Sequence, residues 1–386
     1  MSKPLLIGAM PPPWHGQSVA FKLLVDGYGA AGDPFTLVDL AQGPKTKDKI
    51  GTLSAWRALE YVFILLRVFR AVLLGGGGPV YLTAAQSRQG FLRDVVMIWC
   101  ARLRGCRITA HIHGGNYGDF YRACSPAFRW LVRTTLRQVD CIVLLSEELR
   151  PMMNFDPALG PRLKVVPNSA PFPFESRHRA KELAPGEPVR VLYMSNLVES
   201  KGYFALLKAA DYIINECGRL DFRFDFCGAF LKNDADDVGV TSIEQAKARF
   251  QDFLRQKGLE EYVTYHGVTT GAAKDKAFAE NHLFVLPTRY NNEGQPISII
   301  EALAFGMPVL STRYRAIPDM VVDGQTGLFI RADDPRQIGD AILQAVSSPE
   351  EYARLSRGAA SWARERFGME RHVAELRRCI EGPVAP

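Results

Sequence analysis

The chain has 386 residues, of which 47% are hydrophobic and 23% charged, and its formal net charge is +6. This length exceeds that of one ordinary domain, and the composition excludes a disordered or fibrous protein. The apolar run from Pro4 to Met10 is too short for a signal peptide and leads into prolines, so we expect no secretory leader.

The first half of the chain alternates short apolar segments with amphipathic ones. Strands are expected at residues 4–9, 35–39, 80–83, 107–113, 141–146 and 164–167, and helices at 18–29, 54–74, 89–104 and 126–138. This alternation predicts a parallel sheet with helices on both faces.

Residues 171–188 interrupt the rhythm with four prolines and several charges, which is a linker composition. We therefore predict a first domain over residues 1–170 and a second over 189–368. In the second half, strands are expected at 189–195, 222–227, 262–267, 283–286, 309–311 and 328–330, and helices at 203–216, 243–257, 335–347, 349–367 and 369–380.

Charge is distributed unevenly between the two halves. Residues 1–185 contain 23 Lys and Arg against 13 Asp and Glu, and the remaining residues contain 24 against 28. The asymmetry favours an anionic partner for the first half, with a solvated basic face as the plainer alternative. We expect no nucleic acid partner, because no nucleic-acid-binding motif is recognised. The seven cysteines form no C-x-x-C pair, which favours reduced thiols in a cytoplasmic protein.

The segment from Trp56 to Leu74 is the most apolar long stretch. Because it carries Arg57, Glu60, Arg67 and Arg70, we do not expect it to span a membrane. It is expected to be an amphipathic helix packed on its domain, and the alternative is a helix that also touches a bilayer surface.

The most informative segment is Glu293-Gly-Gln-Pro-Ile-Ser-Ile-Ile-Glu301. Glu293 is expected in a loop after an apolar strand, and Glu301 about one turn into the following helix. Gly294 frees the loop backbone, and Pro296 suits the first turn of a helix. The open amides of a helix start form a site for an anion such as a phosphate. Carboxylates beside such a site suit a reaction on a sugar carried by a nucleotide.

Together with Gly306-Met-Pro-Val309 and Asp323-Gly-Gln-Thr-Gly-Leu328, this segment resembles the signature of the family-4 retaining glycosyltransferases of the GT-B fold. The resemblance extends over almost the whole chain. It implies an α/β protein with two doubly wound, Rossmann-like domains facing a central cleft. It further implies that the N-terminal domain binds the acceptor, that the C-terminal domain binds a nucleotide sugar, and that a final helix, about residues 369–386, packs back on the first domain.

In the first domain, the resemblance implies that the loop containing Gly16 bears on the sugar and phosphates of the donor. Gly16 permits close backbone approach, and Ser18 is expected to cap the helix that follows. His113, at a strand end just before Gly114, is the expected contact to the donor sugar. A purely structural histidine is the alternative, and His111 is the weaker candidate.

In the second domain, the resemblance assigns Lys201 to the donor diphosphate and makes Asn196 a donor-binding residue that carries no charge where the family has arginine. Glu293 is assigned to the sugar and diphosphate, and Glu301 to the ribose hydroxyls. The expected catalytic residues are thus His113, Glu293 and Lys201, and the expected donor-binding residues are Gly16, Asn196, Lys201, Gly294, Gln295, Pro296, Ile297 and Glu301.

A second departure from the family is Arg315-Ala316, where similar chains carry two glycines. Either the loop keeps its course without them, or Arg315 restores a cation near the phosphates. No metal or other cofactor is expected. Asp234 and Asp236 lie in a polar loop with no strand before it, and His111 and His113 have no third ligand nearby.

The predicted function is retaining transfer of a sugar from a nucleotide-diphosphate sugar to an acceptor hydroxyl, on a lipid-linked or polysaccharide-precursor glycan. The expected setting is the cytoplasm, extending to the inner face of an anionic membrane. Two alternatives stay open: another GT-B enzyme, such as a phosphorylase or epimerase, and a non-catalytic subunit that binds a sugar nucleotide.

Overall fold

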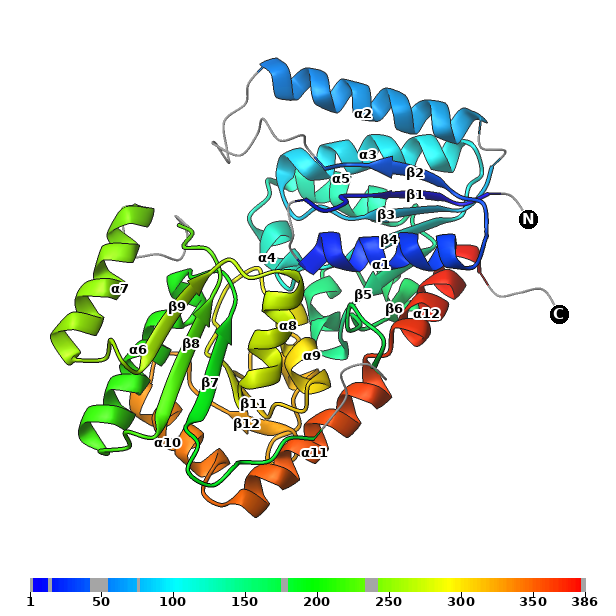
Figure 1. Cartoon of the computed structure of the whole chain (residues 1–386). Coiled ribbons are helices and arrows are strands. Elements are labelled where there is room, and N and C mark those ends of the chain that lie inside the picture. Colours follow the sequence, from blue (N-terminus) through cyan, green and yellow to red (C-terminus); the bar gives the residue numbers. More distant parts are fainter. Residues whose placement is uncertain are drawn as a thin grey trace. The chain divides into compact units, whose positions relative to one another are not determined.

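A computed structural model of the chain describes residues 3–12, 16–41, 55–74, 77–174, 180–232 and 242–382; within the helix over 55–74, it describes the side chains of residues 63–73. The chain forms two compact units, one of residues 1–171 with 369–386 and the other of residues 172–368. Each unit contains one sheet covered by helices (Figure 1).

The first unit contains a six-stranded sheet in the order β2-β1-β3-β4-β5-β6, and neighbouring strands pair in parallel. Its strands are β1 (Leu5–Gly8), β2 (Thr36–Asp39), β3 (Val80–Thr83), β4 (Ile108–Ile112), β5 (Cys141–Leu144) and β6 (Leu163–Val165). Its helices are α1 (Gly16–Ala30), α2 (Ala55–Leu74), α3 (Arg88–Leu103), α4 (Tyr117–Arg122), α5 (Pro126–Leu136) and α12 (Met369–Glu381).

The second unit contains a parallel six-stranded sheet in the order β12-β11-β10-β7-β8-β9. Its strands are β7 (Val189–Met194), β8 (Phe222–Cys227), β9 (Val263–Gly267), β10 (Leu283–Leu286), β11 (Val309–Ser311) and β12 (Gly327–Phe329). Its helices are α6 (Tyr203–Asp211), α7 (Ile243–Lys257), α8 (Gly271–Glu280), α9 (Ile297–Ala304), α10 (Pro335–Ala345) and α11 (Pro349–Arg366). The strand order reverses direction beside β7, so β7 and β10 flank the point where open α/β sheets bind ligands.

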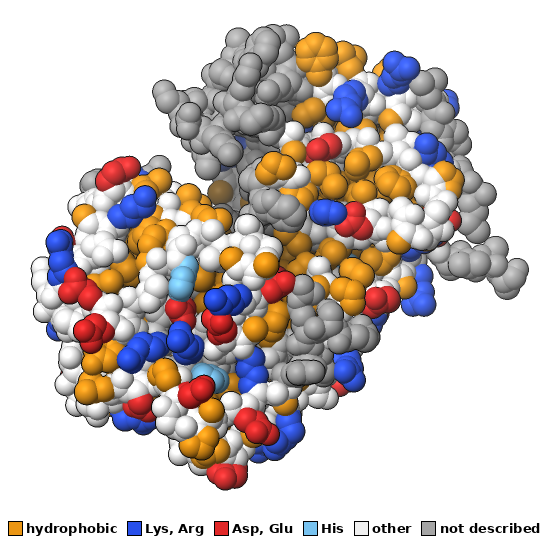
Figure 2. All heavy atoms as spheres, viewed as in Figure 1, with side chains coloured by type: hydrophobic (Ala, Val, Ile, Leu, Met, Phe, Trp, Pro, Cys, Tyr) orange, Lys and Arg blue, Asp and Glu red, His pale blue; other side chains and the backbone are white. Residues whose placement is uncertain are grey.

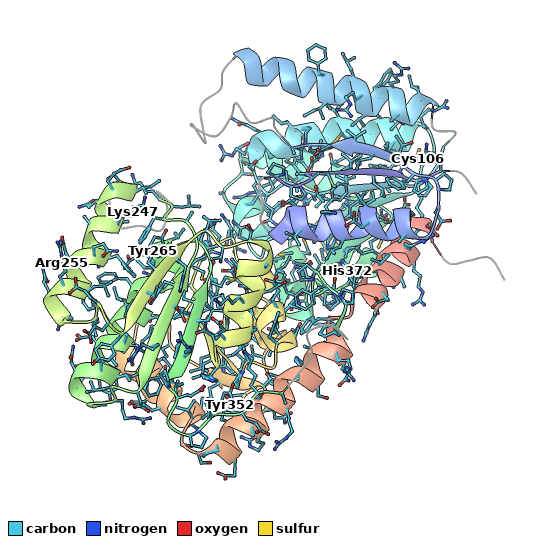
Figure 3. All side chains as sticks on the ribbon, viewed as in Figure 1. Cys106, Lys247, Arg255, Tyr265, Tyr352 and His372 are labelled. Atoms are coloured by element: carbon cyan, nitrogen blue, oxygen red, sulfur yellow. The ribbon has the colours of Figure 1, made fainter. Side chains whose placement is uncertain are left out.

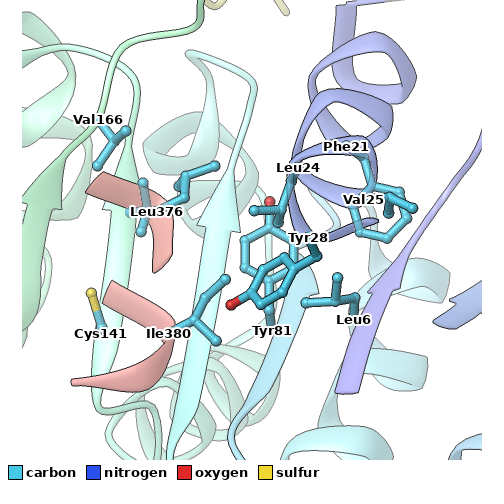
Figure 4. Packing of buried hydrophobic residues seen from close by; sticks show 11 residues of the cluster. Leu6, Phe21, Leu24, Val25, Tyr28, Tyr81, Cys141, Val166, Leu376 and Ile380 are labelled. Atoms are coloured by element: carbon cyan, nitrogen blue, oxygen red, sulfur yellow. The ribbon is translucent and has the colours of Figure 1, made fainter. Parts of the chain in front are cut away.

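Helix α12 completes the core of the first unit although it lies at the far end of the sequence. Leu376 and Ile380 pack with Tyr28 and other buried residues of α1 and the sheet (Figure 4). The Tyr28 hydroxyl donates to Glu381 Oε1 at 2.9 Å. His372, also on α12 (Figure 3), is hydrogen-bonded through Nδ1 to the carbonyl of Pro167 at 2.6 Å. Burial lowers the pKa of His372 to about 4, so this histidine is neutral at pH 7.

The structure differs from the sequence-based expectations at several places. Helix α1 begins at Gly16, so Ser18 lies within the first turn and the prediction that it caps the helix is wrong. Helices α4 and α8 were not anticipated, because both are short and α8 is weakly amphipathic. Part of the expected linker packs on the second unit, where the ring of Phe172 lies 5.6 Å from that of Phe305.

Lys181, also within the expected linker, is anchored to the same unit. Its ammonium donates to the carbonyls of Phe278 at 2.5 Å and Ala279 at 2.9 Å, at the end of α8. A proline-rich composition therefore marks irregular backbone here without excluding tertiary packing.

Within the described part of the chain, no helix is both long and apolar enough to cross a membrane. The seven cysteines are all free thiols.

Candidate functional site

The second unit brings Lys201 and Glu293 together from loops that follow different strands. The Lys201 ammonium lies 3.4 Å from Glu293 Oε2. The Thr288 hydroxyl donates to the same carboxylate oxygen at 3.0 Å, and the Tyr290 ring centroid lies 4.9 Å from Lys201 Nζ. The Lys201 side chain is 17% exposed and that of Glu293 is 7% exposed. A largely buried carboxylate therefore meets a partly accessible cation, although 92 positions separate the two in sequence.

Close backbone contact between the two loops sets this geometry. Gly202 has φ of +80°, and a Cβ atom there would lie 2.1 Å from the carbonyl oxygen of Pro287. The amide of Arg289 also donates to the carbonyl of Ser200 at 2.7 Å. Because only glycine allows both this conformation and this approach, Gly202 fixes the loop after β7 against the loop after β10.

The loop after β8 is held against the loop after β7 in the same way. Gly228 has φ of +142°, and a Cβ atom there would lie 1.9 Å from the carbonyl oxygen of Ser195. The amide of Leu197 donates to the carbonyl of Ala229 at 2.8 Å. Asn196 lies at this junction and is exposed. The loop that carries Asn196, a predicted donor-binding residue, is thus a neighbour of the loop after β8.

Helix α9 starts within a buried segment. Pro296 flanks the helix as its N-cap residue, one position before the predicted first turn, and its side chain cannot cap. Gly294, Gln295, Pro296 and Ile297 are all buried. The amides at a helix start carry a partial positive charge. In the described first turn of α9, no acidic side chain neutralises that charge.

Glu301 lies inside α9 and is 3% exposed. Its Oε1 is 2.6 Å from the ammonium of Lys274, which belongs to the first turn of α8. Lys274 is absent from the predicted site residues, because the sequence pattern does not predict the helix that carries it. The one signal in the sequence for this contact is that Lys274 is a charged residue in the segment that follows β9, 27 positions before Glu301.

Arg315 resolves one of the questions left open by the sequence. It has φ of +53°, so the loop keeps a glycine-like backbone course although the residue is arginine. Its guanidinium donates to Asn291 Oδ1 at 2.8 Å, within the loop that leads to Glu293. The side chain therefore places a cation beside this loop, and its approach to the donor phosphates stays a prediction.

In the first unit, His111 and His113 lie at the end of β4 with ring centroids 3.9 Å apart. His111 is fully buried, and its Nδ1 is hydrogen-bonded to the Tyr81 hydroxyl at 2.8 Å. Burial, and then the proximity of His113, lower the pKa of His111 well below its usual value. His111 is therefore a neutral core residue. His113, the residue predicted to contact the donor sugar, is only half-buried.

Gly16, predicted to approach the donor, is exposed at the start of α1. In the described residues, no group of three or more His, Cys, Asp or Glu side chains could hold a metal ion. Asp234 and Asp236 lie outside the described residues.

Comparison with solved structures defines the fold class. HepE from Anabaena, in complex with UDP and glucose, superimposes with a TM-score of 0.72 at 15% identity and covers 99% of this chain and 100% of that one. Sucrose-phosphate synthase from Thermosynechococcus elongatus gives a TM-score of 0.69 at 16% identity over 97% of both chains. With two parallel six-stranded sheets, the chain has the GT-B fold, as predicted.

Sequence comparison supplies the family. Residues 174–362 match the family model described as glycosyl transferases group 1. This match, which covers most of the second unit, confirms the resemblance seen in its motifs and supports its assignment as a glycosyltransferase.

Two curated proteins are similar to this chain over much of their length. The GDP-mannose-dependent alpha-(1-6)-phosphatidylinositol monomannoside mannosyltransferase of Mycolicibacterium smegmatis is 26% identical over 96% of this chain and 89% of that protein. The alpha-D-kanosaminyltransferase of Streptomyces kanamyceticus is 22% identical over 67% of this chain and 66% of that protein.

Proposed function

We propose that this chain transfers a sugar from a nucleotide-diphosphate donor to an acceptor hydroxyl, with retention of configuration at the anomeric carbon. The observation that carries the proposal is the pairing of Lys201 with Glu293 beside the start of α9. The names of similar proteins support the donor class, since one is dependent on GDP-mannose and another is in complex with UDP and glucose. Retention itself rests on the resemblance to family-4 enzymes.

Departure of the diphosphate requires positive charge where negative charge develops. The Lys201 ammonium and the open amides at the start of α9 would supply it, and fixed donors of this kind are worth most in a water-poor site. Lys201 is mostly shielded from water by its own loop and by Tyr290. Its present partner, Glu293, also binds Thr288, so Lys201 can turn to a diphosphate without leaving the carboxylate unpaired.

Glu293 is assigned to the sugar and the diphosphate, and His113 is assigned to the donor sugar. The carboxylate accepts a hydrogen bond from Thr288, which disfavours it as a free nucleophile even when Lys201 turns to the diphosphate. In the proposed step, the bond from the anomeric carbon to the diphosphate oxygen breaks as the acceptor oxygen bonds on the same face. The acceptor proton passes to the departing diphosphate, so the step forms no covalent intermediate. Lys201 and the amides of α9 take the place of a metal at the diphosphate.

We place the acceptor, a lipid-linked or polysaccharide-precursor glycan, at an anionic membrane surface bound by the first unit. Large apolar side chains stand exposed on α2, α3 and α5: Phe63, Leu66, Phe69, Leu73, Leu92, Val96, Leu103 and Trp130. Arg67 and Arg70 are exposed on α2 among them. The space-filling view likewise shows hydrophobic side chains on the surface of this unit, with basic ones beside them (Figure 2). An amphipathic basic surface binds anionic lipid through burial of apolar area and through charge.

The decisive experiment measures release of free nucleoside diphosphate with and without acceptors, and the anomeric configuration of the product by NMR. Transfer predicts release that depends on an acceptor. Lys201→Ala should lower turnover roughly 100-fold or more, the usual scale for loss of one transition-state charge contact. Lys208→Ala is the matched control, because this exposed lysine lies in the next helix, over the ring of Phe204.

Each alternative has its own outcome in this experiment. Donor binding without turnover across an acceptor panel would identify a non-catalytic subunit. Conversion of the donor without an acceptor would indicate an epimerase, and sugar-phosphate formation from free phosphate would indicate a phosphorylase. A product of inverted configuration would refute retention alone.

A further inference from the structure

The ion pair between Lys274 and Glu301 joins two helices of the second unit. Lys274 lies in the first turn of α8, and Glu301 lies one turn into α9. Their side chains meet at 2.6 Å, with Lys274 30% exposed and Glu301 4% exposed. The Lys274 ammonium also lies 5.9 Å from the ring centroid of Phe278, in the next turn of α8. The contact therefore joins a nearly buried carboxylate to a cation that still reaches the surface.

The asymmetry of burial indicates which partner depends on the other. A carboxylate removed from water is costly unless it is paired, whereas a lysine with nearly a third of its side chain exposed keeps part of its hydration. Lys274 thus balances the charge of the carboxylate and holds its Oε1 in place. A carboxylate has about four acceptor positions on its two oxygens, so it can accept from a ligand hydroxyl as well as from a lysine.

We propose that Lys274 is a positioning residue for the nucleoside part of the donor. It acts by orienting the Glu301 carboxylate toward the ribose hydroxyls. This inference rests on the proposed transfer from a nucleotide sugar and on the assignment of Glu301 to the ribose, which the resemblance implies. Lys274 therefore controls affinity for the nucleoside, while Lys201 and the start of α9 control affinity for the diphosphate. The alternative is that the pair merely joins α8 to α9 and stabilises the fold.

Ligands that lack parts of the donor separate these two roles. Binding of UDP and GDP, of their 2′,3′-dideoxy forms and of inorganic diphosphate is measured by calorimetry on the full chain. Lys274→Gln, which removes the charge but keeps a hydrogen-bond donor, should weaken the preferred nucleoside diphosphate about tenfold. It should leave the dideoxy form and inorganic diphosphate unchanged. Lys274→Arg should retain most of the affinity.

Two further variants complete the test. Lys276→Gln is the matched control, since this lysine lies on the same helix, is 70% exposed and pairs only loosely with Glu280 at 3.7 Å; it should change no affinity. In a Glu301→Gln background, Lys274→Gln should have no further effect on nucleotide binding, because the two residues act as one unit.

The outcomes distinguish this inference from the proposed function. Equal loss of affinity for diphosphate and nucleotide in Lys274→Gln, or additive effects of the two substitutions, would show a structural role and overturn the inference. Unchanged nucleotide affinity in Lys274→Gln would overturn it as well, with the proposed function intact. A wild-type chain that binds neither UDP nor GDP nor their sugars would overturn both.

Discussion

Replacement of Gly202 by alanine tests how the loops after β7 and β10 create the candidate site. An alanine at φ of +80° costs about 1–2 kcal/mol, the penalty of the left-handed region for a residue with a Cβ atom. In addition, its Cβ would lie 2.1 Å from the carbonyl oxygen of Pro287, which is backbone and cannot rotate away. The two loops must then separate by roughly 1 Å to reach ordinary contact, a displacement that costs about 100-fold in rate where reacting groups are positioned.

The displacement acts directly on the pair that carries the proposed function. Lys201 precedes Gly202, and Thr288, which holds Glu293, follows Pro287. The expected result is weaker binding of nucleoside diphosphate and turnover lowered about 100-fold. Gly258→Ala is the matched control, because Gly258 has φ of +64° in the same unit but no atom within 4 Å of the added Cβ. It should lose about 1–2 kcal/mol of stability and keep its activity.

The assays are chemical denaturation, calorimetric binding of nucleoside diphosphate and steady-state turnover for both variants. The difference between the two glycines isolates the backbone clash from the conformational penalty that they share. If Gly202→Ala loses no more stability than Gly258→Ala and still binds and turns over donor, the loop contact does not position the site.

Further predictions concern the ribose site, metal dependence, pH and the membrane. Glu301→Ala should weaken nucleoside diphosphate binding by about 1.5–3 kcal/mol, the usual range for a charged hydrogen bond, and unchanged calorimetric affinity in the folded variant would remove it from the site. Turnover should survive EDTA, whereas silencing by EDTA and rescue by Mn²⁺ would revive Asp234 and Asp236. Because the folded-state pKa of His372 is depressed to about 4, the unfolded chain binds the extra proton first, so stability falls as pH drops below about 6.5. This residue alone should cost about 2 kcal/mol at pH 5, and His372→Gln should flatten the pH dependence of denaturation. Co-sedimentation with anionic vesicles should occur at low salt, weaken at high salt, and decrease in Leu66→Ser and Phe69→Ser; indifference to anionic vesicles at low salt would refute the membrane proposal.

Most strands could be predicted from the sequence alone, because their signal is local. Strands β3, β10 and β11 have the predicted bounds, since a strand buried on both faces shows an apolar run between turn residues. The spacing of Glu293 and Glu301 likewise placed one carboxylate before α9 and the other inside it, because capping and helix periodicity depend on neighbours in sequence.

The contacts within the candidate site were decided by the tertiary structure. Lys201 meets Glu293 because β7 and β10 are adjacent in the sheet, and strand order does not follow from the pattern of any one segment. Lys274 meets Glu301 through α8, whose mixed composition gave no clear periodicity. Arg315 takes a left-handed backbone that its residue type disfavours, so only its surroundings impose that conformation. Local burial patterns thus determined the elements, and the long-range order of the strands determined which charged side chains meet.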